Sequence, residues 1–147
     1  SQISDGAAAL LLVSEDILNK FNLEPIAKIR SMAVVGTDPV LMLSGPIPAT
    51  RKALDQAKLK PEDINLAEIN EAFSSVVGAW RKEFPEINYE NVNANGGSIA
   101  IGHPLGATGA RLMTNLIHEM KRNKLKYGLQ AICEGGGTAN ATIVELV

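Results

Sequence analysis

The sequence has too few cysteines and histidines to build a disulfide or a zinc centre, and it has no apolar run long enough to span a membrane. Its 147 residues include one cysteine and two histidines, which excludes an internal disulfide and provides no zinc-ligand spacing. No apolar run approaches the roughly 18 residues that a membrane-spanning helix requires. We therefore expect no metal and no membrane contact. A reducing compartment is expected, the cytoplasm, or mitochondria or peroxisomes if the source is eukaryotic.

An excess of charge of one sign is also missing. The chain has 14 Lys and Arg residues against 16 Asp and Glu residues, for a net charge of -2, and they are scattered along it. A nucleic-acid binder presents a clustered basic surface, so we expect no nucleic-acid partner. The length suits one domain with its own core. Because the sequence opens at Ser1 in mid-pattern, without an initiator methionine, we expect it to be a piece of a longer protein.

Helical and strand patterns alternate along the chain. A continuous small and aliphatic run from Ala7 to Val13 predicts a buried strand, although its alanines would also suit a helix. Asn70 can cap a helix whose apolar stripe includes Phe73. Further strands are expected over Ile26–Val35, Leu66–Ile69, Leu129–Cys133 and Ala141–Val147, and further helices after Ser14, from Pro48 and after Gly109. This interleaving predicts an α/β layered fold with a mixed β-sheet covered by helices.

Two glycine-rich segments carry the most reactive side chains. Asn93–Arg111 contains five glycines around His103, and Cys133 precedes the run Gly135–Gly137. Glycine lets a backbone approach a reacting group closely, and imidazole and thiol groups can exchange protons near neutral pH. The alternatives are structural: a loop histidine bonded to a nearby carbonyl, and a cysteine buried as a small apolar residue. The presence of both segments favours a single active site.

Five segments, in this order along the chain, resemble the C-terminal half of thiolases. They are Ser4–Leu10, Gly45–Leu54, Asn70–Phe73, Asn93–Arg111 and Cys133–Gly137. The resemblance covers nearly the whole chain and implies a thiolase-like layered fold. It implies Claisen chemistry that makes or cleaves 3-ketoacyl-CoA through an acyl-cysteine, with acyl-CoA and coenzyme A as substrates and no other cofactor. A homo-oligomer, dimer or tetramer, is expected on the same ground.

The resemblance also implies roles for four residues. His103 would activate the nucleophilic cysteine and donate a hydrogen bond to the thioester oxygen. Cys133 would be the acid and base at the α-carbon, and we expect His103 and the glycine loop to favour its thiolate. Asn70 would fix a water that joins His103 in an oxyanion hole, unless it serves only as a helix cap. The backbone N–H of Gly135 is expected to serve an oxyanion hole as well.

Four neighbouring residues carry further expectations. By resemblance Phe73 borders the acyl pocket, although its helical spacing predicts a core residue, and Ser1 contacts the pantetheine arm of coenzyme A. Glu71 is expected in the first helical turn, where a carboxylate interacts favourably with the helix dipole. Alternation along a strand should turn Glu134 away from Cys133.

Residues 1–147 are thus expected to form a thiolase C-terminal domain without the N-terminal half that carries the nucleophilic cysteine. Two alternatives remain. A β-ketoacyl synthase would use two histidines in place of one histidine and Cys133. A non-catalytic acyl-CoA or lipid-binding module of the same fold would have no need for Asn70, His103, Cys133 and Gly135 together. The sequence therefore favours the enzyme.

Overall fold

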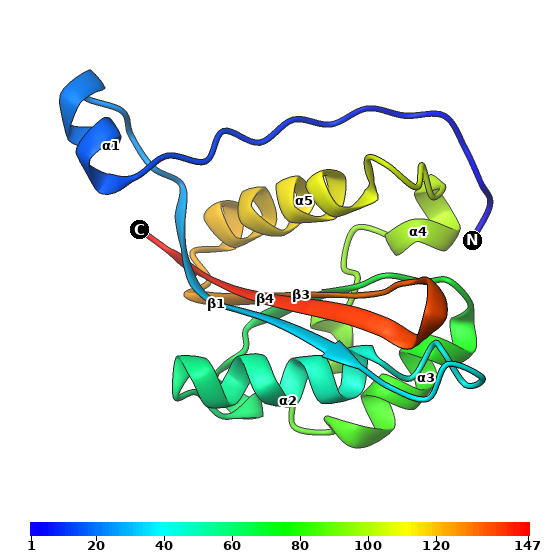
Figure 1. Ribbon diagram of the computed structural model, residues 1–147. Coiled ribbons are helices and arrows are strands. Elements are labelled where there is room, and N and C mark those ends of the chain that lie inside the picture. The colour runs from blue at the N-terminus through cyan, green and yellow to red at the C-terminus, as the bar shows by residue number, and fades with distance from the viewer.

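The computed structural model describes residues 1–147 and is built around a mixed sheet of four strands, in the order β1-β4-β3-β2 (Figure 1). The strands are β1 (Ala27–Gly36), β2 (Leu66–Ile69), β3 (Tyr127–Cys133) and β4 (Thr138–Leu146). The helices are α1 (Glu15–Phe21), α2 (Pro46–Ala57), α3 (Ser74–Glu83), α4 (Gly97–Ile101) and α5 (Thr108–Asn123), with 3₁₀ turns at Pro61–Asp63, Tyr89–Asn91 and Gly135–Gly137. Strand β4 is antiparallel to β1 and β3, whereas β2 runs parallel to β3.

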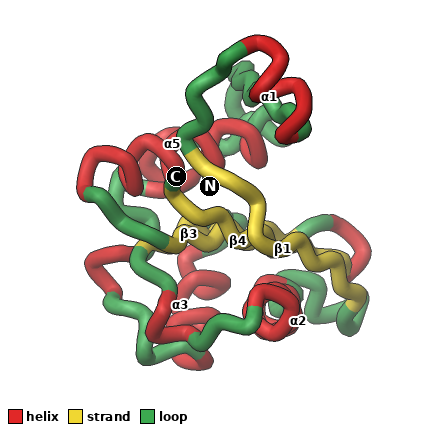
Figure 2. Tube along the Cα trace, turned by 90° about the vertical axis from the view of Figure 1, so that its left-hand side faces the viewer, coloured by secondary structure: helices red, strands yellow, loops and turns green.

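Helices α2 and α3 cover one face of the sheet, and α4 and α5 lie on the other (Figures 1 and 2). The larger core lies under α2 and α3, where the rings of Trp80 and Phe84 are 4.9 Å apart between centroids. The buried Trp80 indole donates a hydrogen bond of 2.9 Å to the Thr50 hydroxyl of α2. This bond satisfies both buried polar groups, so the two helices are joined without an unpaired donor.

The smaller core lies between α5 and the opposite face of the sheet. Leu116 and Met120 of α5 pack on Leu66 of β2 and Val144 of β4. A side chain at Gly128 of β3 would overlap Met120 and lie within 3.1 Å of Leu116. The missing Cβ therefore lets the helix lie directly on the strand.

Most of the expected elements are confirmed. Strand β2 has the expected bounds, β1 begins and ends one residue later than expected, and β3 and β4 form the expected antiparallel hairpin with longer strands. Ser14 caps α1, since its hydroxyl accepts a hydrogen bond of 3.4 Å from the backbone N–H of Ile17. Pro48 lies in the first turn of α2. The layered α/β fold with a mixed sheet is therefore as predicted.

The strand predicted at Ala7–Val13 is wrong. The segment is extended but pairs with no strand, and Leu11 and Leu12 are 82% and 69% exposed. In Figure 1 it runs in dark blue above α5. An apolar run predicts burial, but a strand also requires backbone hydrogen-bond partners, and the chain provides none for this segment.

The helix predicted to begin at Asn70 begins later. Helix α3 starts at Ser74, with Phe73 at the N-cap position and no side-chain capping bond. Glu71 therefore lies outside the helix rather than in its first turn, and Phe73 is 62% exposed rather than in the core. The side chains of Asn70 and Glu71 are bonded to the segment around α4 instead. Tertiary hydrogen bonds have thus taken the place of a local cap.

The helices are also short relative to a bilayer. None of them is long and apolar enough to cross a membrane.

Candidate active site

Asn70 and Cys133 meet where β2 and β3 end. The two strands run parallel with Ile69 opposite Ala131, and the Asn70 N–H donates a 2.9 Å hydrogen bond to the Ala131 carbonyl. Parallel strands end at the same edge of a sheet, so the next residues of both strands share that edge. The Asn70 side chain lies near the Cys133 thiol and acts to lower its pKa. The structure therefore brings together two of the predicted site residues.

A serine of the glycine-rich segment orients Asn70. The Ser98 hydroxyl of α4 donates a 2.9 Å hydrogen bond to Asn70 Oδ1, and both residues are buried. Because Oδ1 accepts the bond from Ser98, the NH₂ group of Asn70 points away from Ser98. Donors at this position can bind the Cys133 sulfur or a water, and they match the predicted function of Asn70 better than a helix cap does.

His103 is held in one tautomer by Thr108. The Thr108 hydroxyl donates to the Pro104 carbonyl at 2.9 Å and lies 2.7 Å from His103 Nδ1. A hydroxyl has one proton, so Thr108 must accept the second hydrogen bond, which places the imidazole proton on Nδ1. Nε2 then carries the free lone pair that a general base requires.

The charge state of His103 favours the same function. Burial lowers the pKa of His103, and the Arg111 guanidinium lowers it further. Because each effect disfavours the imidazolium, the ring is neutral over a wider pH range than a solvated histidine.

The backbone at Gly102 requires glycine. Its φ of +83° is strained for other residues, and a Cβ there would overlap the Ser4 hydroxyl. The next residue, His103, donates its backbone N–H to the Gln2 carbonyl at 2.8 Å. The start of the chain therefore passes directly over the histidine loop.

The expectation that the surroundings of Cys133 favour the thiolate is wrong. Burial raises the pKa of the thiol, and the nearby Glu134 carboxylate raises it too, although the Cys133 backbone N–H and the Asn70 amide act in the opposite direction. Cys133 is 8% exposed, so its charged form loses most of its hydration. As predicted, Glu134 is turned from the sulfur: its carboxylate accepts hydrogen bonds from Thr138 and Asn140. A neutral thiol is suited to donating a proton.

The other predicted catalytic residues, His103 and Gly135, lie on the loops around Asn70 and Cys133. The His103 ring is hydrogen-bonded to Thr108 and not to Asn70 or Cys133. Gly135 is exposed and opens the 3₁₀ turn after Cys133, and a Cβ there would meet no atom within 4 Å. This chain alone therefore gives no steric reason for glycine at 135.

Ser1 and Phe73 flank the loop that follows Asn70. The Ser1 nitrogen lies 3.2 and 3.0 Å from the carbonyl oxygens of Glu71 and Ala72, and Phe73 is the exposed aromatic next in sequence. Phe73 therefore lies on the loop that follows Asn70, and the start of the chain contacts that loop.

Sequence reasoning missed the residues that join these loops. The Glu71 carboxylate accepts hydrogen bonds from the Ile99 N–H at 2.7 Å and the Asn93 amide at 2.8 Å. Asn93 also exchanges two hydrogen bonds with the backbone of Ile69, at 2.7 and 2.9 Å, as a neighbouring strand would. Glu71 and Asn93 lie inside segments already singled out, but their polar character alone does not reveal which partner each one binds.

Glu68 is a buried carboxyl group beside the site. It lies on β2, facing α5, and is 1% exposed. Burial raises its pKa from 4.5 to about 7; the carboxylates of Glu71 and Glu119 also raise it, and Arg111 lowers it. One oxygen of Glu68 and the side-chain oxygen of Gln130, its register partner on β3, have no hydrogen-bond partner. A protonated Glu68 would supply the donor that these two acceptors lack.

Glu68→Gln should therefore stabilise the fold at high pH. The carboxyl group is neutral in both states below pH 4.5, so stability is lost as pH rises from 4.5 through about 7. We expect the variant to gain about 3 kcal/mol in the free energy of unfolding at pH 8 and little at pH 4. Urea unfolding at the two pH values measures this, with exposed Glu62→Gln as the control. An equal effect at both pH values would contradict the raised pKa.

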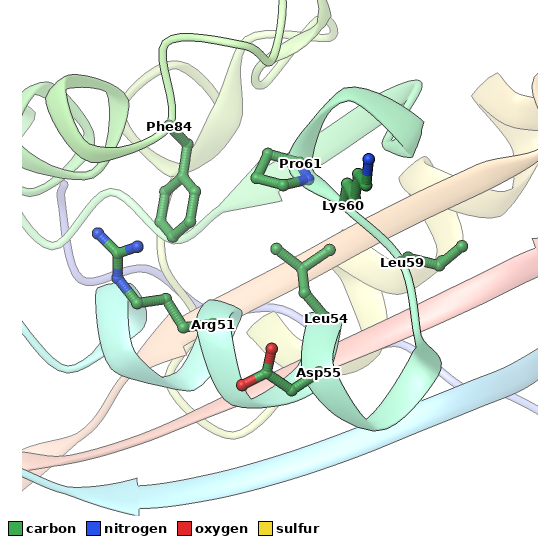
Figure 3. A pocket seen from close by; sticks show the side chains of 7 residues that line it. All are labelled: Arg51, Leu54, Asp55, Leu59, Lys60, Pro61 and Phe84. Carbon is green, nitrogen blue, oxygen red and sulfur yellow. The ribbon is translucent and has the colours of Figure 1, made fainter.

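The concave surfaces of the chain lie elsewhere. A hollow of about 960 Å³ lies between residues 9–13, α1, β1 and α5. A second, of about 420 Å³, is lined by Arg51, Leu54, Asp55, Leu59, Lys60, Pro61 and Phe84 (Figure 3). Neither of these two hollows includes Asn70, His103 or Cys133.

Comparisons with known proteins show the family of this chain. A family model described as the thiolase C-terminal domain matches residues 23–146. A steroid 3-ketoacyl-CoA thiolase of Mycobacterium tuberculosis is 56% identical over 145 residues, which are 99% of this chain and 35% of that protein. A 3-ketoacyl-CoA thiolase of Escherichia coli is 46% identical over 149 residues, covering 100% of this chain and 38% of that protein.

A solved structure gives the same result. The human mitochondrial 3-ketoacyl-CoA thiolase in complex with CoA superimposes with a TM-score of 0.87 and 40% identity, over 90% of this chain and 34% of that one. The layered α/β fold of this chain is therefore found in a solved 3-ketoacyl-CoA thiolase. The chain belongs to the thiolase family and corresponds to its C-terminal domain. It spans little more than a third of the length of the curated relatives described above.

Proposed function

We propose that this chain is the C-terminal catalytic part of a longer acyl-CoA C-acyltransferase, which makes or cleaves 3-ketoacyl-CoA. The observation that carries the proposal is the hydrogen bond between Ser98 and Asn70, with Cys133 near Asn70, beside a histidine loop with a free Nε2. The remainder of the protein would supply the nucleophilic cysteine. Its substrates would be acyl-CoA and coenzyme A, and the intact protein would assemble as a homo-oligomer.

In the cleavage direction His103 begins the reaction. Its Nε2 accepts the proton of the nucleophilic cysteine, and the resulting thiolate attacks the 3-keto carbon of the substrate. The imidazolium then donates a hydrogen bond to the oxygen, on which negative charge develops. A water bound by the Asn70 amide donates the second hydrogen bond, so the oxyanion is stabilised from two sides.

Cys133 completes the cleavage. When the bond between the α-carbon and the keto carbon breaks, the electron pair moves to the α-carbon and the thiol of Cys133 protonates it. The shortened acyl group stays on the nucleophilic cysteine, and acetyl-CoA leaves. Coenzyme A then transfers its thiol proton to the Cys133 thiolate and attacks the acyl-cysteine. The nucleophilic cysteine leaves as a thiolate and takes back the proton that His103 has held, which restores all three groups. The N–H of Gly135 would stabilise the charge on the enolate or thioester oxygen near Cys133.

The experiment is a comparison of the full-length protein with residues 1–147 alone. We expect the full-length protein to convert acetoacetyl-CoA and coenzyme A to acetyl-CoA, and residues 1–147 to give no product above a Cys133→Ser background. The physical reason is that the chain contains one cysteine, whereas the reaction needs a nucleophile and a separate acid. Product is measured by chromatography of the CoA esters.

Two outcomes would contradict the proposal. Turnover by residues 1–147 alone would remove the need for a second cysteine. Binding of acyl-CoA by the full-length protein without any turnover would support the non-catalytic binding module instead.

A further inference from the structure

We propose that Arg111 is a positioning residue for His103, acting through the carbonyl groups of Ile101 and Gly102. The proposal rests on the function proposed above, in which His103 is the base. Arg111 touches neither the imidazole nor the sulfur in any hydrogen bond of the structure, so its effect would be on the backbone that carries His103.

The contacts of Arg111 form a fork on two consecutive carbonyl groups. Its Nη1 donates to the Ile101 carbonyl at 3.1 Å, and its Nη2 donates to the Gly102 carbonyl. These carbonyls lie where α4 ends, the end of a helix at which a cation is favourable. A planar guanidinium binds two acceptors in fixed relative positions, which an ammonium group cannot do. The side chain therefore fixes both peptide groups that precede His103.

The loop needs this support because its sequence gives it little stiffness. Gly102 has a positive φ and no side chain of its own to pack. The remaining restraints on His103 are its N–H bond to Gln2 and its ring bond to Thr108. The latter comes from α5, the helix that also carries Arg111, so ring and backbone are held against one element. A shift of about 1 Å at a reacting group can cost about a hundredfold in rate.

Arg111 also acts on His103 through its charge. It takes part in no ion pair, and its buried Nε has no hydrogen-bond partner. The charges that act on His103 are Arg111 and the Ser1 ammonium, and the carboxyl group of Glu68 on β2 interacts with Arg111 from the other side. Where another residue precedes Ser1, its nitrogen is an amide, and Arg111 is then the remaining cation. Removal of Arg111 should therefore raise the pKa of His103.

Two substitutions of Arg111 distinguish the effect of its paired hydrogen bonds from the effect of its charge. Arg111→Lys keeps the cation but cannot bind both carbonyls in the same geometry, whereas Arg111→Gln loses both. Arg122→Gln is the matched control, because Arg122 lies on the same helix, its side chain is 66% exposed, and it pairs with Glu119. All three are made in the full-length protein.

The kinetic test measures thiolysis against pH. For Arg111→Lys we expect kcat to fall about 10- to 100-fold, with KM within about twofold of wild type and the acidic limb of the pH profile unchanged. For Arg111→Gln we expect a similar or larger fall in kcat, with the acidic limb moved to higher pH. Arg122→Gln should match wild type in both respects. Wild-type kcat in Arg111→Lys would overturn the positioning function.

A second measurement does not depend on turnover. Diethylpyrocarbonate modifies neutral imidazole, so the rate of modification of His103 against pH, followed by tandem mass spectrometry, reports its titration. Exposed His118 is the reference within the same chain. We expect the His103 curve to move to higher pH in Arg111→Gln and not in Arg111→Lys. An unmoved curve in Arg111→Gln would overturn the charge effect. If the wild-type protein showed no thiolysis, the proposed function would fail, while this titration would still test the action of Arg111 on His103.

Discussion

Replacing His103 with alanine in the full-length protein should slow formation of the acyl-enzyme by about a thousandfold or more. The variant loses the proton acceptor for the nucleophile and one donor to the thioester oxygen. General base catalysis contributes about 10²- to 10⁴-fold, and the loss of a single oxyanion donor costs about 10²- to 10³-fold. Rapid-quench sampling, with the acyl-enzyme quantified by mass spectrometry, measures the rate of this step directly.

His118→Ala is the control for this result. His118 is the other histidine of the chain and is exposed on α5, so its loss should leave acylation near the wild-type rate. Stability should change little in either variant, since the His103 side chain contributes one hydrogen bond, to Thr108, worth about 1 kcal/mol. Acylation at the wild-type rate in His103→Ala would exclude His103 as the base.

Replacing Cys133 with serine should leave acylation of the nucleophilic cysteine by acetyl-CoA intact, because no bond at the α-carbon changes in that step, but stop condensation with a second acetyl-CoA. The hydroxyl has nearly the same shape but is a far weaker acid, so it can neither take the proton from the α-carbon in synthesis nor return it in cleavage. Burial already raises the pKa of the thiol, so a still weaker acid has little residual activity in this site. We expect the acyl-enzyme to accumulate and the overall rate to fall by about 10³- to 10⁴-fold.

Two measurements decide the assignment of Cys133. Mass spectrometry of the trapped intermediate should find the acyl group on a cysteine outside residues 1–147, and the variant should not exchange the α-protons of acetyl-CoA with solvent. An acyl group on Cys133 in the wild-type protein would make it the nucleophile. Exchange at the wild-type rate in Cys133→Ser would show that another group moves the proton.

Local sequence patterns correctly predicted the helices and strands that other residues of this chain bury. Strand β2 and the stripe of Leu112, Leu116 and Met120 on α5 agree with the structure because both are buried by residues of this chain. The strand predicted at Ala7–Val13 is not formed. A local pattern shows that a segment is apolar, but it does not show whether another strand is available to pair with it. It failed for Asn70 because a capping residue can also bond to a distant side chain.

Residue types and their spacing along the chain were enough to predict the α/β class and the family. How the candidate residues are held depends on the folded chain. There Asn70 is hydrogen-bonded to Ser98 and lies near Cys133, His103 is bound to Thr108 through Nδ1, and the thiol is buried so that its pKa rises. The physical reason is that the direction of a hydrogen bond and the hydration of a charge depend on atoms brought together from distant parts of the chain.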